Sequence, residues 1–247
     1  MDTDHTIDFV EYQLPLGRQQ LPGAGTVDLW WINLDSIGGS IMAGGTVPVH
    51  PGETVRARRF ASRFLLKMFL GAYLHIPGKD VFLIRNRFGK PGLDPEHHAE
   101  PLFFNISHSH QWMLFAVNAA KIVGVDIENT RRSTDPIRLA ARYFSATEVE
   151  ALQNVDGDLR TIAFLRAWTH KEAVLKARGF GLAGNMDQVV VEIDPSLPAR
   201  VIADRDGGPR WQLLDLTLED NMIGALAYAG NIKTINARRL VVQNRGS

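Results

Sequence analysis

The chain has 247 residues, of which 45% are hydrophobic and 22% charged, and its 27 basic and 27 acidic side chains give a formal net charge of zero. This balance argues against a protein that coats nucleic acid or an anionic membrane through bulk charge, so we expect neither partner. Cysteine is absent, which excludes disulfides and thiolate metal sites. The polar N-terminus lacks a signal-peptide pattern, so we expect a cytoplasmic protein.

The first half of the sequence predicts one long helix among strands. Residues 1–25 mix polar residues with Pro and Gly, and we expect them to be poorly ordered. The apolar periodicity then predicts the following elements: a strand at 27–34, a loop at 36–52, a helix at 55–75, a strand at 81–84, a turn at 88–93, and strands at 102–109 and 112–117.

The predicted helix at 55–75 is strongly basic. Five cations follow Glu53 without an intervening acid: Arg56, Arg58, Arg59, Arg63 and Lys67. A solvated face is the simplest interpretation for most of them. Their one-sided distribution also favours a second interpretation, a site for an anion.

The second half predicts a strand around Asp126, then helices, then further strands. Residues 137–143 predict a short helix, and Ser145 with Glu148 has the spacing of a capping box that opens another. The long helix at 160–178 should end at Gly179 and Gly181. The remaining strands are predicted at 189–193, 211–218, 223–228 and 240–242.

Two carboxylates lie close together in the predicted strand Gly124-Val125-Asp126-Ile127-Glu128. Residues at i and i+2 of a strand share one face, so both acids point the same way. Exposed acids on an edge strand, paired with Arg131 or Arg132, are an equally simple interpretation of the spacing alone. The apolar neighbours favour a buried strand, in which the carboxylates need a cation or hydrogen-bond donors.

A second acidic motif lies in the long helix, Trp168-Thr169-His170-Lys171-Glu172-Ala173-Val174-Leu175-Lys176. Glu172 and Lys176 are neighbours at i and i+4, a spacing that also occurs in ordinary stabilising pairs. If Glu172 joins Asp126 and Glu128, the cluster suits a hard divalent cation that holds phosphate oxygens.

Polar residues at the end of one strand suggest phosphate binding. Ser107 and His108 are adjacent on a strand and so point to opposite faces, and no G-x-S-x-G elbow precedes them, which disfavours a hydrolase triad. Lys90 lies in a turn fixed by Pro91, where it could reach an anion or be an ordinary exposed lysine.

Taken together, the motifs resemble those of the Sfp-type 4'-phosphopantetheinyl transferases. The matching stretches, in the family's order, are residues 89–91, 104–109, 124–128, 144–148, and 168–176 with 179–182. The resemblance implies an α+β fold of two similar subdomains related by a pseudo-twofold, with the ligand cleft between them. We expect residues 1–118 to form the N-terminal subdomain and residues 119–247 the subdomain that carries the metal, in a monomer.

The resemblance also implies roles for individual residues. Asp126, Glu128 and Glu172 would hold Mg²⁺, and Mn²⁺ would suit the same oxygen ligands. Coenzyme A would be bound by residues of both subdomains: Arg58 or Arg59, Lys90, Pro91, Ser107, His108 and Lys176. Phe180 replaces a lysine that is common in the family, which puts one further cation of the cleft in doubt.

The implied reaction transfers the 4'-phosphopantetheine arm of coenzyme A to a serine of an apo carrier protein and releases 3',5'-ADP. Glu172 would take the serine proton and Lys176 would stabilise the leaving group. The carrier could be an acyl, peptidyl or aryl carrier of polyketide, nonribosomal-peptide or other pathways, docking near residues 130–153. The rival interpretations are a non-catalytic coenzyme A-binding or nucleotide-binding module and a magnesium-dependent phosphohydrolase.

Overall fold

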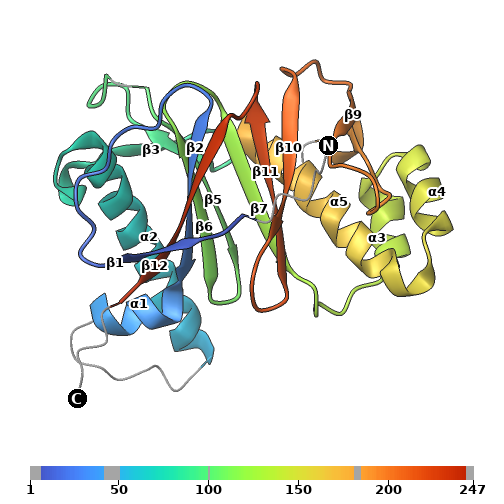
Figure 1. Ribbon diagram of the computed structural model, residues 1–247, viewed down its shortest axis with the longest axis horizontal. Helices are drawn as coiled ribbons and strands as arrows, with labels where there is room; N and C mark the ends of the chain where they lie inside the picture. Colours follow the sequence, from blue (N-terminus) through green and yellow to red (C-terminus); the bar gives the residue numbers. More distant parts are fainter. Residues whose placement is uncertain (1–6, 42–50, 100, 181–184, 243–247) are drawn as a thin grey trace.

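The structure, a computed structural model, describes residues 7–41, 51–99, 101–180 and 185–242. It is a mixed α/β fold in which two long helices, α2 (Pro51–Leu74) and α5 (Gly157–Arg178), lie on opposite sides of the central strands (Figure 1). In the described part of the chain, no helix is long and apolar enough to cross a membrane.

The larger sheet has five strands in the order β1-β12-β2-β6-β5. Their bounds are Val10–Gln13 (β1), Thr234–Val241 (β12), Thr26–Asn33 (β2), Trp112–Asn118 (β6) and Phe103–Ser109 (β5). β12 runs parallel to both β1 and β2, whereas the β2–β6 and β6–β5 pairs are antiparallel. Strand β12 belongs to the predicted C-terminal subdomain, so a division at residue 118 separates the chain into two stretches but does not separate the sheets.

The smaller sheet has three antiparallel strands in the order β10-β11-β7, with bounds Trp211–Thr217, Met222–Ala229 and Val123–Asn129. Its strand β7 lies beside β5 of the larger sheet (Figure 1). Side chains rather than a backbone ladder join them, since the Val125 N–H donates to Asn105 Oδ1 at 3.0 Å and the Ile127 N–H to Ser107 Oγ at 3.3 Å.

Apolar side chains divide the interior into three layers. Trp30 and Ile32 of β2 face helix α2, while Leu29 and Trp31 of the same strand face Val125 of β7. This alternation is the period of two expected of a strand that is buried on both faces. A third cluster lies between α5 and the outer face of the smaller sheet.

The remaining elements connect and cover these layers. They are α1 (Leu34–Ile41), η1 (Gly78–Asp80), β3 (Leu83–Arg85), β4 (Pro91–Leu93), α3 (Pro136–Tyr143), α4 (Ala146–Asn154), η2 (Met186–Gln188), β8 (Val189–Val191) and β9 (Val201–Asp204). β3 and β4 form a hairpin, and so do β8 and β9. The predicted capping box is confirmed, because Ser145 Oγ accepts from the Glu148 N–H while Glu148 accepts from the Ser145 N–H.

Two expectations about the first fifty residues were wrong. Within the segment expected to be disordered, β1 forms an edge strand because it pairs with β12 from the other end of the chain. Within the predicted loop at 36–52, α1 forms because Asn33 Oδ1 accepts from the Asp35 and Ser36 N–H groups and Ile37 is fully buried. Residues 42–50, and the predicted helix stop at Gly181, lie outside the described residues.

Candidate active site

Helix α5 lies directly on strand β7 because residue 124 is glycine. A Cβ built at Gly124 would come within 2.0 Å of the Ala173 carbonyl oxygen and 2.6 Å of the Ala177 nitrogen. No other residue type fits at this close approach of backbone to backbone. The contact fixes the height of Glu172 and Lys176 above Asp126, so the glycine that opens the first acidic motif determines how the two motifs meet.

Asp126, Ser107 and Lys176 form one hydrogen-bonded group. Lys176 Nζ lies 2.6 Å from Asp126 Oδ1 and 2.8 Å from Ser107 Oγ, and the Ser107 hydroxyl donates to the same Asp126 oxygen at 2.8 Å. Asp126 and Ser107 are buried, while Lys176 is half-buried. Three elements, β5, β7 and α5, therefore contribute one side chain each to a single polar cluster.

Glu172 lies at the edge of this cluster and is 4% exposed. Its Oε1 atom is buried and has no hydrogen-bond partner among the described residues. Burial, together with the negative charge of Asp126, raises the pKa of Glu172 to about 7, an effect that Lys176 partly offsets. A buried carboxyl oxygen without a partner is costly, so this group is prepared for a cation or a proton.

Glu128 is partly buried and bonded to Arg132, whose Nη1 lies 2.9 Å from Glu128 Oε1. An ion pair of the β7 acids with Arg131 or Arg132 was the alternative interpretation of the sequence, and Glu128 makes such a pair with Arg132. Burial and the charge of Asp126 nevertheless raise the pKa of Glu128, so the arginine does not cancel the repulsion between the acids. In the described part of the chain, no three acidic or histidine side chains converge closely enough, as they stand, to hold a metal ion.

Lys90 reaches the same region from the β3–β4 hairpin. Its Nζ donates to the Ala177 carbonyl oxygen at 2.9 Å, next to the backbone of Lys176. Asn86 holds the turn by accepting from the Lys90 N–H at 3.0 Å and donating to the Gly179 carbonyl oxygen at 2.7 Å. Burial lowers the pKa of Lys90 to about 8, because the ammonium is poorly solvated there, and an anion bound beside it would stabilise the charge.

His108 points away from the acidic cluster, toward helix α2. Its Nε2 atom and Ser62 Oγ share a hydrogen bond of 2.6 Å. Desolvation of the ring and the charge of Lys176 lower the pKa of His108, so the imidazole is neutral. The structure thus separates Ser107 and His108, one toward Asp126 and the other toward α2, as their adjacent strand positions require.

The two arginine candidates of α2 differ in their surroundings. Arg58 is held by Asp35 of α1, with its Nε 2.7 Å from Oδ1 and its Nη2 2.6 Å from Oδ2. Arg58 precedes Ser62 by one helical turn and therefore shares the face that meets His108, whereas Arg59 is more exposed. Pro91 begins β4 immediately after Lys90.

Four residues of this region were not predicted from the sequence: Asp35, Ser62, Asn86 and Asn105. Asn86 had a detectable signal, because asparagine before a glycine turn often accepts hydrogen bonds from the following N–H groups. Asn105 lay within a quoted motif, but its bond to the Val125 N–H depends on strands that are not neighbours in a sheet.

Comparison with known proteins agrees with this geometry. The 4'-phosphopantetheinyl transferase superfamily matches residues 122–227, which include β7, α5 and most of the smaller sheet. The 4'-phosphopantetheinyl transferase HetI of Nostoc sp. is 35% identical over 215 residues, or 83% of this chain and 88% of HetI. The chain belongs to the 4'-phosphopantetheinyl transferase superfamily. The family resemblance expected from the motifs is thereby confirmed.

Two further relatives of this transferase are similar over shorter stretches. The 4'-phosphopantetheinyl transferase Sfp of Bacillus subtilis is 31% identical over 157 residues, or 59% of this chain and 66% of Sfp. The 4'-phosphopantetheinyl transferase Gsp of Aneurinibacillus migulanus is 34% identical over 125 residues, or 51% of this chain and 49% of Gsp. The chain is therefore a 4'-phosphopantetheinyl transferase.

Proposed function

We propose that the transferase moves the 4'-phosphopantetheine arm of coenzyme A to a serine of an apo carrier protein with the help of Mg²⁺ bound at Asp126, Glu128 and Glu172. The observation that carries this proposal is the buried Oε1 of Glu172, which lacks a partner beside two other carboxylates of the same cluster. Burial and the charge of Asp126 raise the pKa of both Glu128 and Glu172, so a cation bound at this cluster would stabilise the ionised carboxylates.

The donor set fits a hard divalent cation, although the side chains do not yet surround one. Carboxylate oxygens are the ligands that Mg²⁺ prefers, and Mn²⁺ accepts the same set. The cluster already contains two internal cations, with Lys176 on Asp126 and Arg132 on Glu128. A metal bound to these carboxylates would displace the Lys176 ammonium and the Arg132 guanidinium. The phosphates of coenzyme A would then supply anions for the two displaced cations.

When bound, the metal would draw negative charge from the transferring phosphoryl group and orient it for in-line displacement. The serine oxygen of the carrier forms the new bond to the β-phosphorus, and the bond from that phosphorus to 3',5'-ADP breaks. Glu172 accepts the serine proton, directly or through a water. Lys176 stabilises the charge that develops on the departing phosphate.

The remaining groups bind coenzyme A. Lys90 and Lys176 lie along the end of α5, where both ammonium groups can hold pyrophosphate oxygens. Ser107 fixes Lys176 and contributes a hydroxyl, and Pro91 restrains the turn that positions Lys90. His108 receives the 3'-phosphate together with Arg58 or Arg59, and proximity of the phosphate would protonate its imidazole.

We further propose that the chain acts as a monomer whose two halves are related by a pseudo-twofold. In support, α2 covers a sheet that contains β5 and β6, while α5 covers one that contains β7 and β11. Residues 1–118 and 119–247 would form these halves, with coenzyme A between them and the carrier, an acyl, peptidyl or aryl carrier, docked near residues 130–153. Exposed arginines of that segment, such as Arg138 and Arg142, suit an acidic partner.

Intact-protein mass spectrometry of an apo carrier incubated with the chain, coenzyme A and Mg²⁺ tests the proposal. We expect a mass gain of one phosphopantetheine arm that is lost with EDTA and in Glu172→Gln, but kept in the matched control Glu11→Gln, at an exposed position of β1. Coenzyme A binding without transfer to several carriers would favour the binding module. Free phosphate released from coenzyme A would favour the phosphohydrolase.

A further inference from the structure

The outer face of α2 combines exposed aromatic rings with cations, and the transfer chemistry uses neither. Phe60 is 52% exposed and Phe64 is 45% exposed, although both belong to a long helix whose opposite side is packed in the core. Residues 60 and 64 point away from Ser62, because successive helical residues are rotated by about 100°. The face therefore lies on the far side of α2 from the His108 contact.

The same face carries unpaired positive charge. Between Glu53 and Asp80 the sequence has no acidic residue. Within the described residues, Arg56, Arg63 and Lys67 take part in no ion pair, unlike Arg58. A helix face that is both basic and apolar is typical of a surface that receives an acidic amphipathic partner or an anionic membrane.

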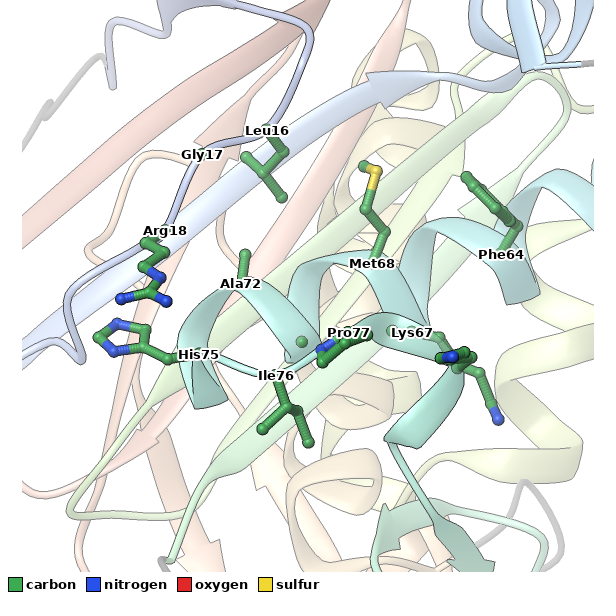
Figure 2. A pocket seen from close by; sticks show the side chains of 13 residues that line it. Leu16, Gly17, Arg18, Phe64, Lys67, Met68, Ala72, His75, Ile76 and Pro77 are labelled. Carbon is green, nitrogen blue, oxygen red and sulfur yellow. The ribbon is translucent and has the colours of Figure 1, made fainter.

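This face leads into a groove of about 610 Å³ along the C-terminal half of α2 (Figure 2). Its apolar lining residues come from three segments: Leu16, Phe64, Met68, Ala72, Ile76 and Pro77. Four basic residues, Arg18, Lys67, His75 and Lys79, also line it, and no acidic residue does. Asp80 follows Lys79 in the chain but is not part of the lining.

Backbone contacts hold both walls of the groove against α2. A Cβ at Gly71 would come within 2.6 Å of the Ile76 carbonyl oxygen, so the turn after α2 is packed against the helix itself. On the other wall, the Gln19 N–H donates to the Ala72 carbonyl oxygen at 3.0 Å, and His75 Nε2 lies 2.9 Å from the Gln19 carbonyl oxygen. Because both walls are tied to α2, the groove exists before any partner arrives.

We propose that the outer face of α2 and this groove bind an acidic amphipathic helix of a partner protein. The basic walls match acidic side chains, and the apolar lining with Phe60 and Phe64 matches the apolar stripe of such a helix. The surface from Arg56 to His75 is about 28 Å long at 1.5 Å per residue, a length that a partner helix of about 19 residues would cover. A planar membrane would leave the concave groove unfilled.

This surface lies on α2, on the opposite side of the central strands from α5 and its Glu172, so a partner helix and the carrier serine can be bound at once (Figure 1). Fluorescence anisotropy with a labelled synthetic helix of about 20 residues, leucine at helical spacing and glutamate elsewhere, tests it with the chain saturated by coenzyme A and Mg²⁺. We expect saturable binding that weakens with salt, and about tenfold weaker binding for Phe64→Ser and for Lys79→Glu. The matched surface controls Ile202→Ser, at a residue that is 55% exposed on β9, and Lys233→Glu should bind normally.

Three results would overturn the proposal. Equal binding of a scrambled peptide of the same composition would mean charge attraction alone. Absence of saturable binding would remove the proposed helix site. Sedimentation with phosphatidylglycerol vesicles but no peptide binding would assign the face to a membrane.

The helix site and the transfer reaction can be tested independently. Carrier modification should be unchanged in Phe64→Ser and Lys79→Glu, and peptide binding does not require transfer activity. Failure of one proposal is therefore distinguishable from failure of the other.

Discussion

Lys176 Nζ lies 2.6 Å from Asp126 Oδ1, so a cation of the protein's own occupies the side of Asp126 that a metal ligand would use. If Asp126 holds the proposed Mg²⁺, the lysine and the metal compete for this carboxylate until an anion draws the ammonium away. Metal binding and coenzyme A binding would then be coupled through Lys176, and by thermodynamic linkage each would strengthen the other.

Lys176→Met should consequently tighten the binding of Mn²⁺ to the chain alone while abolishing transfer. We expect Mn²⁺ affinity without coenzyme A to rise about tenfold, because the competing ammonium is gone. Electron paramagnetic resonance of free Mn²⁺ measures this affinity directly. Weaker Mn²⁺ binding in Lys176→Met than in the unchanged chain would show that the lysine does not compete with the metal.

Glu172→Gln should stabilise the metal-free protein at high pH more than at low pH. The pKa of Glu172 in the folded state, about 7, lies above that of an unfolded glutamate. Its stabilising contribution is therefore complete below pH of about 4 and is lost as pH rises through about 7. Since glutamine does not ionise, the gain of Glu172→Gln over the unchanged chain should be larger at pH 8 than at pH 5 by about 2–3 kcal/mol.

Urea unfolding at both pH values, in EDTA, measures this difference in the free energy of unfolding. Glu11→Gln, at an exposed position of β1, is the control for the loss of one carboxylate. A gain for Glu172→Gln that is equal at pH 5 and pH 8 would contradict the raised pKa.

Gly124→Ala should lose activity and stability together. The new Cβ would collide with the Ala173 carbonyl oxygen and the Ala177 nitrogen, so α5 has to move away from β7. We expect a loss of roughly 2–3 kcal/mol in the free energy of unfolding and a kcat that falls because Glu172 is displaced from Asp126. Thermal unfolding and carrier modification measure both. The control is Gly92→Ala, where no atom lies within 4 Å of the added Cβ.

Lys90→Arg should change how 3',5'-ADP binding depends on pH. Burial lowers the pKa of Lys90 to about 8, so the free protein loses this charge as pH rises through that value. Calorimetry should show that 3',5'-ADP binds more weakly to the unchanged chain at pH 9 than at pH 7. The dependence should be flatter in Lys90→Arg, because arginine stays charged. Parallel pH profiles for the two proteins would exclude Lys90 from the phosphate site.

A double-mutant cycle should decide whether Arg58 or Arg59 holds the 3'-phosphate. If Arg58 does, Asp35→Ala releases it from its bidentate pair and lowers KM for coenzyme A, whereas Arg58→Ala raises KM. The benefit of Asp35→Ala should vanish in the Arg58→Ala background. A benefit that persists there and disappears in Arg59→Ala would assign the phosphate to Arg59.

The sequence predicted the elements that depend on local pattern and missed those that depend on distant pairing. Helix α5 and the Ser145 capping box were recognisable because periodicity and caps involve residues within a few positions. Strand β1 was missed because its partner, β12, lies more than 200 residues away. Helix α1 was missed because its glycines obscured the burial of Ile37.

For the site, the motifs supplied candidate side chains but not their partners in the structure. Asp126 was expected to hold a metal and Ser107 and Lys176 to bind coenzyme A, and the structure brings these three side chains together. The Arg58–Asp35 pair could not be foreseen, since it depends on how α1 is oriented against α2. Nor could the role of Gly124, whose importance comes from a helix that begins more than 30 residues later.

The position of β12 has a consequence for biosynthesis. β2 lies between β6 and β12, so its outer edge has no partner until residues 234–241 have left the ribosome. A nascent chain with both helices and the active-site strands already translated would still present the unpaired backbone of β2 to its surroundings. Strand β12, the last strand in the described part of the chain, thus completes the larger sheet, and a truncation before residue 234 would leave one edge of β2 unpaired.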